Sequence, residues 1–252
     1  MSADGATPRL LVVRLGTLPY GEALELQRAV ARARITGAIA DDVLLLVEHP
    51  PVFTFGRSTK ATSLPLDADA LRARGVEVFE IERGGDVTFH GPGQLVGYPV
   101  VDLKRHRKDL HWYLRQVEEA LIRGVARFGV AGGRHAGYTG VWVGDGDPAG
   151  ADFVPRRKMA SIGVHARDWV TWHGFALNVT REPLRYFDLV VPCGIAGVDM
   201  TAVARETGRA VTVDEVGEAV AAAFGEVFAL ATAALPAHVL RELAATPAST
   251  PV

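Results

Sequence analysis

Cysteine is almost absent from this chain, which has one, Cys193, among its 252 residues. A single thiol excludes a disulfide framework and a zinc site built from several cysteines. Cys193 is therefore either a small buried hydrophobe or a reactive thiol. Pro192 before it and Gly194 after it are typical of a turn, where a thiol can be presented to a ligand.

A long apolar run and an export signal are also missing. No stretch approaches the roughly 18 apolar residues that a membrane helix needs, and residues 1–8 are short and polar. They contain no basic region followed by an apolar stretch and a cleavage site, so they do not resemble a signal peptide. With one cysteine and no such signal, we expect the protein in the cytoplasm and away from membranes.

A large charge of either sign is lacking as well. The formal net charge is −2 and the isoelectric point is about 6.4, which does not favour non-specific nucleic-acid binding. Basic residues do cluster in 104–108 and 156–158. Each run is either solvated surface or a docking patch for an acidic partner protein, and charge alone does not decide between them.

The chain does have enough apolar sequence for one sizeable domain. Of its 252 residues, 48% are hydrophobic and 22% are charged, and no linker-like stretch divides them. Residues 144–152, rich in glycine and aspartate, indicate a surface loop. We therefore expect a single domain over residues 1–252, acting as a monomer, with disorder at the extreme end of the tail formed by residues 236–252.

Hydrophobic periodicity predicts strands and helices in an irregular order. Branched and apolar runs indicate strands at 9–15, 42–48, 76–82, 94–103, 138–143, 160–166 and 175–179. Helical spacing indicates helices at 20–35, 111–128 and 211–230, the last with Asp214 as a candidate cap near its start. Because strands and helices do not alternate regularly, the order favours an α+β fold with a mixed sheet (mixed-sheet α/β) over a doubly wound nucleotide fold.

Residues 83–94 form the densest motif, Arg-Gly-Gly-Asp-Val-Thr-Phe-His-Gly-Pro-Gly-Gln. Its four glycines require a backbone that turns sharply or lies against a ligand. The spacing is neither that of a dinucleotide fingerprint nor that of a phosphate-binding loop. Two linked tight turns would explain the glycines alone, whereas the embedded Arg83, Thr88 and His90 favour a binding site.

Two further segments have both an ordinary and a functional interpretation. In residues 157–164, Lys158 precedes a strand of small residues, although most lysines are simply solvated. Residues 172–179 hold small and apolar side chains, which fit a core strand or the wall of a hydrophobic slot.

Taken in order, several segments closely resemble one known family, the lipoyl(octanoyl) transferases. The matching segments are residues 48–57, 83–99, 140–143, 158–163 and 173–179, followed by Pro192-Cys193-Gly194. The resemblance covers residues 12–201, and it is specific because separate motifs match in the same order. Residues 144–155 and the chain after residue 201 carry no diagnostic motif of that family.

The resemblance implies a fold like the catalytic domain of biotin and lipoate protein ligases. It also implies that Cys193 carries the acyl group as a thioester and that Lys158 assists it. The implied substrate pocket is lined by Arg83, Gly84, Gly85, Asp86, Val87, Thr88, Phe89, His90, Ser161, Ile162, Gly163, Gly174, Phe175 and Ala176.

The implied reaction moves an octanoyl group from octanoyl-acyl carrier protein to a lysine of a lipoyl domain, a step of protein lipoylation. The acceptors would be lipoyl domains of 2-oxoacid dehydrogenase E2 subunits and the H protein of glycine cleavage. A free cysteine has a pKa of about 8.5, and a nearby ammonium favours its thiolate. The scheme needs no ATP, cofactor or metal, and His90 would position either the substrate carbonyl or the lysine.

Other activities stay open from the residues alone. A lipoate or biotin ligase would share the fold but would activate its acid with ATP. An amidase or thioesterase would pair Cys193 with His90 or His173 and hydrolyse the acyl-enzyme. A non-catalytic acyl-binding or carrier-binding module would use the same pocket with an inert Cys193.

Overall fold

The computed structural model describes residues 8–59, 68–73, 76–189 and 198–245. Its strands are β1 (Arg9–Thr17), β2 (Asp42–Glu48), β3 (Val52–Phe55), β4 (Glu77–Glu80), β5 (Thr88–His90), β6 (Gln94–Val100), β7 (Gly133–His135), β8 (Tyr138–Asp145), β9 (Val154–Arg167), β10 (Val170–Asn178), β11 (Asp199–Met200) and β12 (Ala231–Ala234). Its helices are α1 (Tyr20–Thr36), α2 (Ala68–Arg72), α3 (Leu110–Ala126), α4 (Val203–Thr207), α5 (Val213–Phe228) and α6 (Ala237–Ala245), with 3-10 helices η2 (Leu103–Arg105) and η3 (Glu182–Leu189).

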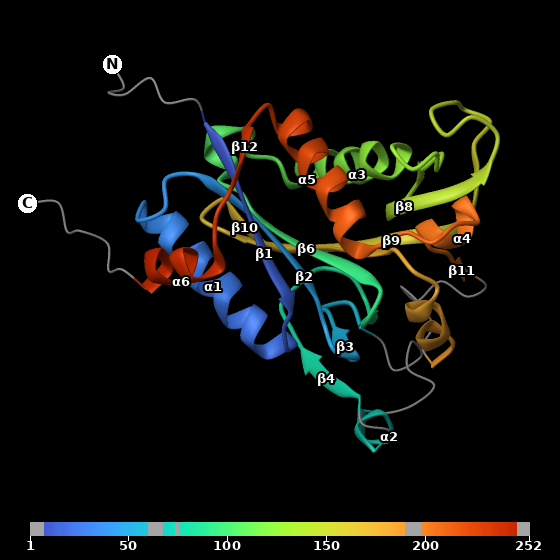
Figure 1. The fold of residues 1–252 in the computed structure, drawn as a ribbon, viewed down its shortest axis with the longest axis horizontal. Coiled ribbons are helices and arrows are strands. Elements are labelled where there is room, and N and C mark those ends of the chain that lie inside the picture. Colours follow the sequence, from blue (N-terminus) through green and yellow to red (C-terminus); the bar gives the residue numbers. More distant parts are fainter. Residues whose placement is uncertain (1–7, 60–67, 74–75, 190–197, 246–252) are drawn as a thin grey trace, which may run out of the picture.

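A large mixed sheet organises these elements (Figure 1). Its nine strands run in the order β12-β1-β2-β6-β10-β9-β8-β7, with β11 paired to β9. β1 is parallel to β2 and β12, whereas the pairs from β2 through to β7 are antiparallel. The α+β class with a mixed sheet, predicted from the irregular order of elements, is confirmed.

Helices cover both faces of this sheet. Leu10 and Leu11 show how the alternation of a strand supplies both faces. Leu10 packs in the core with Val117 of α3 and Phe224 of α5, whereas Leu11 packs in the core with Val30 of α1. α6 packs on the α1 side of the sheet. It lies in the tail formed by residues 236–252, in which the sequence predicted disorder only at the extreme end. Residues 246–252, on which that prediction falls, lie outside the described residues.

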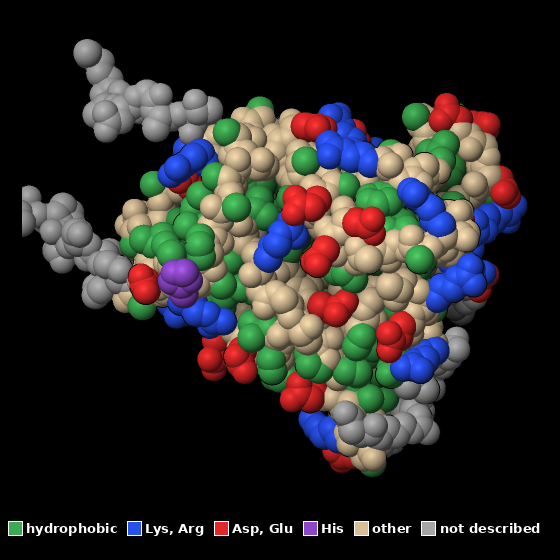
Figure 2. Space-filling view, viewed as in Figure 1, with side chains coloured by type: hydrophobic (Ala, Val, Ile, Leu, Met, Phe, Trp, Pro, Cys, Tyr) green, Lys and Arg blue, Asp and Glu red, His purple; other side chains and the backbone are tan. Residues whose placement is uncertain are grey.

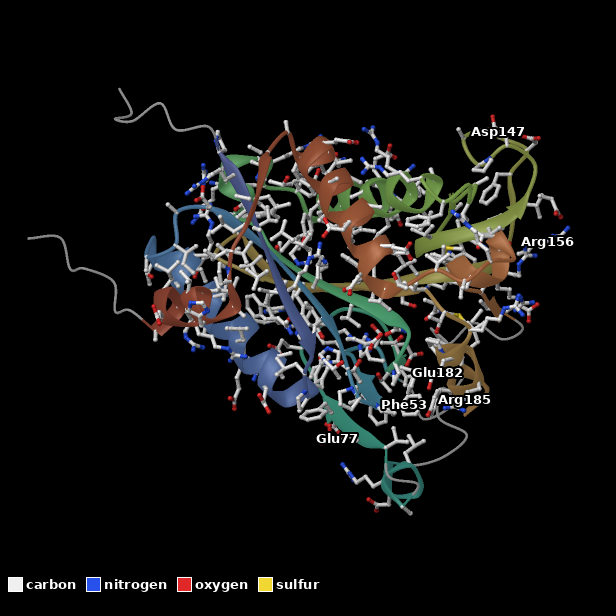
Figure 3. All side chains as sticks on the ribbon, viewed as in Figure 1. Phe53, Glu77, Asp147, Arg156, Glu182 and Arg185 are labelled. Atoms are coloured by element: carbon white, nitrogen blue, oxygen red, sulfur yellow. The ribbon has the colours of Figure 1, made fainter. Side chains whose placement is uncertain are left out.

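A second, three-stranded sheet with the order β4-β3-β5 has a core of its own. Phe53 of β3 packs there with Phe89 of β5 and Phe187 of η3. Figure 3 shows the labelled Phe53 close to Glu182 and Arg185 of η3. This small sheet holds the glycine-rich segment in place, because its last strand, β5, lies within that segment.

The main strands and helices expected from periodicity are present, and most differences lie at their ends. The strand expected at 94–103 stops at Val100, because Asp102 accepts a hydrogen bond from Lys104 N (3.1 Å) and caps η2. Asp214 does not cap α5 as predicted. Thr212 does so, in a capping box with Glu215. Within the described ranges, no helix is both long and apolar enough to cross a membrane.

We predict that Thr212→Ala lowers the free energy of unfolding by about 1 kcal/mol, because the helix loses its N-terminal hydrogen bonds. Urea unfolding of the purified variant measures this change. Asp214→Ala is the matched control and should cost less, since Asp214 contributes only a favourable charge in the first turn. A larger loss in the Asp214 variant would contradict the assignment of the cap.

Candidate active site

The glycine-rich segment lies directly against strand β9. Gly84 N donates a hydrogen bond to Val164 O (3.0 Å), and a Cβ at position 163 would come within 2.6 Å of Gly84 O. Because that Cβ would collide with the carbonyl, glycine at 163 is what allows the segment to approach the sheet so closely. Gly85 has a φ of 86°, a left-handed value that favours glycine. The segment therefore forms one wall of a cavity that the sheet closes from the other side.

This cavity is narrow, with a volume of about 50 Å³. It brings together most of the residues that the sequence assigned to the pocket. Those residues are Arg83, Gly85, Asp86, Val87, Thr88, His90, Ser161, Ile162, Gly163, Gly174, Phe175 and Ala176. Tyr20, Tyr98 and His173, which the sequence did not assign to it, also line the cavity.

Gly84 and Phe89, also expected in the pocket, are not part of its lining. Gly84 contributes the backbone contacts to β9 described above. Phe89 points the other way because side chains alternate along β5, so that Thr88 and His90 face the cavity. The Phe89 ring packs against Tyr186, with ring centroids 4.2 Å apart. Its role is to hold the small sheet together.

Arg83 is buried and donates hydrogen bonds to Thr54. Its Nη2 lies 2.6 Å from Thr54 O and 2.9 Å from Thr54 Oγ1. Thr54 Oγ1 in turn lies 3.4 Å from His90 Nε2. A guanidinium has no acceptor, so the threonine hydroxyl accepts from Arg83.

The polar chain continues from His90 across the sheet. Gln94 Nε2 donates to Phe89 O (3.1 Å) and to Asn178 Oδ1 (2.9 Å), so its Oε1 is the acceptor facing His90 Nδ1 (2.9 Å). Asn178 Nδ2 donates to Thr201 O (3.0 Å). The network therefore runs from the glycine-rich segment to the residue that follows β11.

His90 lies in the cavity wall with both ring nitrogens engaged by protein groups. Burial lowers its pKa well below the ordinary value for histidine, with the nearby His49 ring and Arg83 adding to the shift. A neutral ring that donates from Nδ1 and accepts at Nε2 fits this environment. The sequence left two roles open for His90, the positioning of the substrate carbonyl or of the lysine. These hydrogen bonds favour neither role and hold His90 as a fixed part of the cavity wall.

Lys158 is buried, with a relative exposure of 2%. Its Nζ lies 5.3 Å from the centre of the Trp142 ring, a distance at which a cation is attracted to an aromatic face. Trp142 is opposite Lys158 and Val141 is opposite Ala160, so Met159 is the extra residue of a β-bulge. The solvated position that is usual for lysine does not apply here.

The end of the Lys158 side chain lies beside Gly140. A Cβ at position 140 would come within 2.8 Å of Lys158 Cε and 3.5 Å of Nζ. Gly140 N donates to Glu118 Oε1 (3.0 Å), and Glu118 is fully buried on α3. Gly140 is also the strand partner of Ser161, which lines the cavity. The end of the lysine side chain therefore lies beside the strand position, that of Ser161, at which the cavity begins.

The buried position of Glu118 could have been predicted from the sequence. It is a charged residue directly after Val117, within the apolar stripe predicted for the helix at 111–128. A carboxylate at such a position needs partners inside the protein. Arg115 Nη1 (2.6 Å) and Arg134 Nε (3.1 Å) both donate to its Oε2.

Cys193, the predicted nucleophile, lies outside the described residues. The described chain resumes at Val198, and β11 then pairs with β9. In that pairing Met200 is opposite Lys158, and Thr201 N donates to Lys158 O (2.9 Å). The chain that follows Cys193 thus returns to the strand of Lys158.

The basic run at 104–108 is partly used within the protein. His106 Nε2 lies 2.7 Å from Asp42 Oδ2, and Arg107 pairs with Asp109 (3.3 Å). Figure 2 shows Lys and Arg side chains interspersed with Asp and Glu over the face that it displays. The docking patch stays a prediction, and the local charges do not strengthen it.

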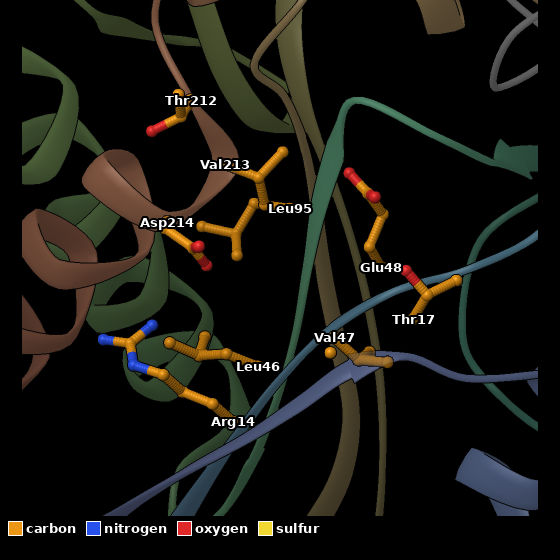
Figure 4. Close-up of a pocket in the computed structure, with 10 residues that line it drawn as sticks. Arg14, Thr17, Leu46, Val47, Glu48, Leu95, Thr212, Val213 and Asp214 are labelled. Atoms are coloured by element: carbon orange, nitrogen blue, oxygen red, sulfur yellow. The ribbon is translucent and has the colours of Figure 1, made fainter.

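A larger cavity, of about 370 Å³, lies elsewhere, at the start of α5 (Figure 4). Arg14 and Glu48 are part of its lining, and both have partners in the chain. Arg14 pairs with Glu218 (2.6 Å), and Glu48 Oε2 accepts from Gly93 N (2.8 Å). None of the pocket residues predicted from the sequence is in its described lining. We therefore locate the candidate site at the narrower cavity beside Lys158.

Known proteins resemble this chain in sequence and in fold. The octanoyltransferase of Acidobacterium capsulatum is 47% identical over 228 residues, covering 87% of this chain and 90% of that protein. The octanoyltransferase of Myxococcus xanthus is 44% identical over 220 residues, covering 87% of this chain and 59% of that longer protein. A bipartite lipoate protein ligase from Thermoplasma acidophilum has a similar fold, with a TM-score of 0.70 at 17% identity over 94% of this chain and 91% of that chain.

A family model covers most of the chain as well. The lipoyl protein ligase A/B catalytic domain matches residues 19–225, which include the glycine-rich segment, Lys158 and Cys193. The chain belongs to the lipoyl protein ligase A/B catalytic domain family.

Proposed function

We propose that this protein transfers an octanoyl group from octanoyl-acyl carrier protein to a lysine of a lipoyl domain, through a thioester on Cys193. The observation that carries the proposal is the buried Lys158, whose side chain ends beside a narrow cavity with apolar walls. The octanoyltransferase relatives, at 44% and 47% identity, support the same reaction. A cytoplasmic location remains the prediction made from the sequence.

In the first half-reaction, the Cys193 thiolate attacks the carbonyl carbon of the donor thioester. A carbon–sulfur bond to Cys193 forms while the bond to the carrier's sulfur breaks. The Lys158 ammonium favours the attacking thiolate and then donates a proton to the departing one. One thioester replaces another of similar energy, so this step is nearly balanced.

In the second half-reaction, the amine of the acceptor lysine attacks the same carbonyl carbon. Lys158, now neutral, accepts the proton that this amine loses. The bond to Cys193 breaks and the thiolate is restored. Because an amide is more stable than a thioester, this step runs downhill and regenerates both catalytic groups.

The cavity is suited to the acyl chain. Val87, Ile162, Phe175 and Ala176 give it apolar walls, and each methylene that leaves water contributes about 0.8 kcal/mol. Lipoyl domains of 2-oxoacid dehydrogenase E2 subunits and the glycine cleavage H protein are the proposed acceptors. They would approach the mouth of the cavity, where Lys158 ends.

Intact mass spectrometry tests the covalent scheme. After mixing with octanoyl-acyl carrier protein, the wild type should gain one octanoyl group, which a lipoyl domain then removes. Cys193→Ser should gain none, because a hydroxyl is a far weaker nucleophile and leaving group. Modification of the lipoyl domain only when ATP and free octanoate are present would instead indicate a ligase.

Lys158→Arg should lower kcat/KM for octanoyl transfer by about 10²- to 10⁴-fold, because arginine keeps the charge but cannot give up its proton. Steady-state kinetics with the carrier-protein donor measure this loss. Lys104→Arg is the matched control, since Lys104 is partly exposed and pairs with Asp102, and it should keep the wild-type rate. A wild-type rate in the Lys158 variant would contradict proton transfer by this residue.

Gly140→Ala should slow octanoyl transfer at least tenfold, because the added methyl group would crowd both Ala160 O and the end of Lys158 (2.8 Å to Cε). Gly137→Ala is the control for backbone strain. Gly137 also has a positive φ, of 83°, but a Cβ there meets nothing within 4 Å. Kinetics and thermal unfolding of both variants separate the two effects. Equal rates in the two variants would show that the space left free by Gly140 has no catalytic importance.

A further inference from the structure

His173 has an unusual backbone for its place in a central strand. Its φ of 56° is left-handed, a conformation that is strained for a residue with a side chain. Along β10, Trp172 and Ala176 pack on the α1 side of the sheet, whereas Phe175 and Leu177 pack on the α3 and α5 side. Regular alternation would place His173 with Phe175 and Leu177.

The left-handed turn places the ring on the other face, within the cavity. His173 lines the cavity, and its Nε2 lies 3.7 Å from Glu82 Oε1. Its relative exposure is 1%. A strained residue that departs from the pattern of its strand and enters a cavity points to a role in that cavity.

The ring of His173 is also unsatisfied. Neither of its nitrogens has a hydrogen-bond partner among the described residues, and the same holds for Gln27 Nε2. Gln27 is fully buried on α1, and its Oε1 accepts from His173 N (3.1 Å). Buried polar atoms without partners are rare in native proteins. These atoms are therefore available to a ligand that enters the cavity.

Other polar side chains of the cavity are already engaged by protein groups. Arg83 donates to Thr54, His90 bonds Gln94, and the Tyr98 hydroxyl bonds His49 Nε2 (2.7 Å). Burial lowers the pKa of His173, although the neighbouring Glu82 opposes the shift. The ring is therefore neutral at pH 7 and offers one donor and one acceptor.

The strand register places His173 at the far end of the cavity from Lys158. The end of Lys158 lies beside Gly140, the partner of Ser161, whereas His173 is opposite Val164. On β9, Ser161 and Val164 are three residues apart, which corresponds to about 10 Å along the strand at about 3.3 Å per residue. The seven carbon–carbon bonds of an octanoyl chain, each about 1.5 Å long, span about 9 Å when extended in a zigzag.

Building on the proposed function, we propose that His173 and Gln27 form a polar end to the acyl cavity and set the length of chain that it accepts. By these lengths, an eight-carbon chain ends just short of these groups. A longer chain must bring its methyl end against the nitrogens of His173 and Gln27, which is unfavourable. The cavity thus measures chain length by polarity as well as by space.

Kinetics with hexanoyl, octanoyl, decanoyl and dodecanoyl donors on acyl carrier protein test the proposal. His173→Phe replaces the polar end with an apolar ring, and the ratio of kcat/KM for decanoyl over octanoyl should rise about tenfold. His173→Asn keeps a polar side chain that tolerates the left-handed backbone, and it should keep the octanoyl preference. His165→Phe is the matched control. His165 is the adjacent histidine on β9, next to Trp172, and does not line the cavity, so the ratio should not change.

A measurement on the wild type covers the case in which His173→Phe does not fold. The ring nitrogen NMR signals of His173 should stay unchanged when hexanoate binds and shift when decanoate binds. An unchanged decanoyl ratio in a folded His173→Phe variant, or unchanged ring signals with bound decanoate, would refute the polar end while octanoyl transfer stands. If the wild type transfers no octanoyl group at all, the proposed function fails first, and the length measurement fails with it.

Discussion

Two backbone carbonyls, Phe89 O and Thr201 O, set the direction of the hydrogen bonds on which the site depends. Because Gln94 Nε2 donates to Phe89 O, its Oε1 must accept from His90 Nδ1, and the neutral ring then accepts at Nε2 from Thr54 Oγ1. The same order continues through Asn178 to the backbone beside β11. Two backbone acceptors therefore fix two amide orientations and the tautomer of one histidine. The resulting chain of hydrogen bonds links the glycine-rich segment to the strand that returns to Lys158.

Three buried histidines around the cavity show how environment separates structural from binding groups. His49 lies between Leu18 O and the Tyr98 hydroxyl, and burial lowers its pKa to about 4. His90 is likewise engaged at both nitrogens. His173 is as deeply buried, but neither of its nitrogens has a hydrogen-bond partner among the described residues, and Glu82 lies 3.7 Å from its Nε2. Burial of a histidine alone does not identify a binding group, whereas burial without partners does.

Periodicity predicted the long elements because each buries a regular face, but it could not predict features that depend on contacts between distant residues. β3 and β5 are only four and three residues long, too short for a pattern. The resemblance to known transferases supplied Lys158 and most of the cavity lining. His173 was considered only as an alternative base, since its left-handed backbone has no sequence signal. Tyr20 and Tyr98 reach the cavity from elements whose own patterns describe only core packing.

Two local departures from strand alternation build the site. On β9, the bulge at Met159 turns Lys158 to the face of Trp142, while Met159 and Ala160 both pack under α3 and α5. On the adjacent strand β10, the left-handed backbone at His173 turns its ring to the cavity. A one-residue shift reverses the face of every side chain that follows it in a regular strand. Single-residue departures instead redirect one polar side chain each and leave the apolar faces intact. A sheet with cores on both sides can thus place polar groups at the two ends of one cavity without giving up either core.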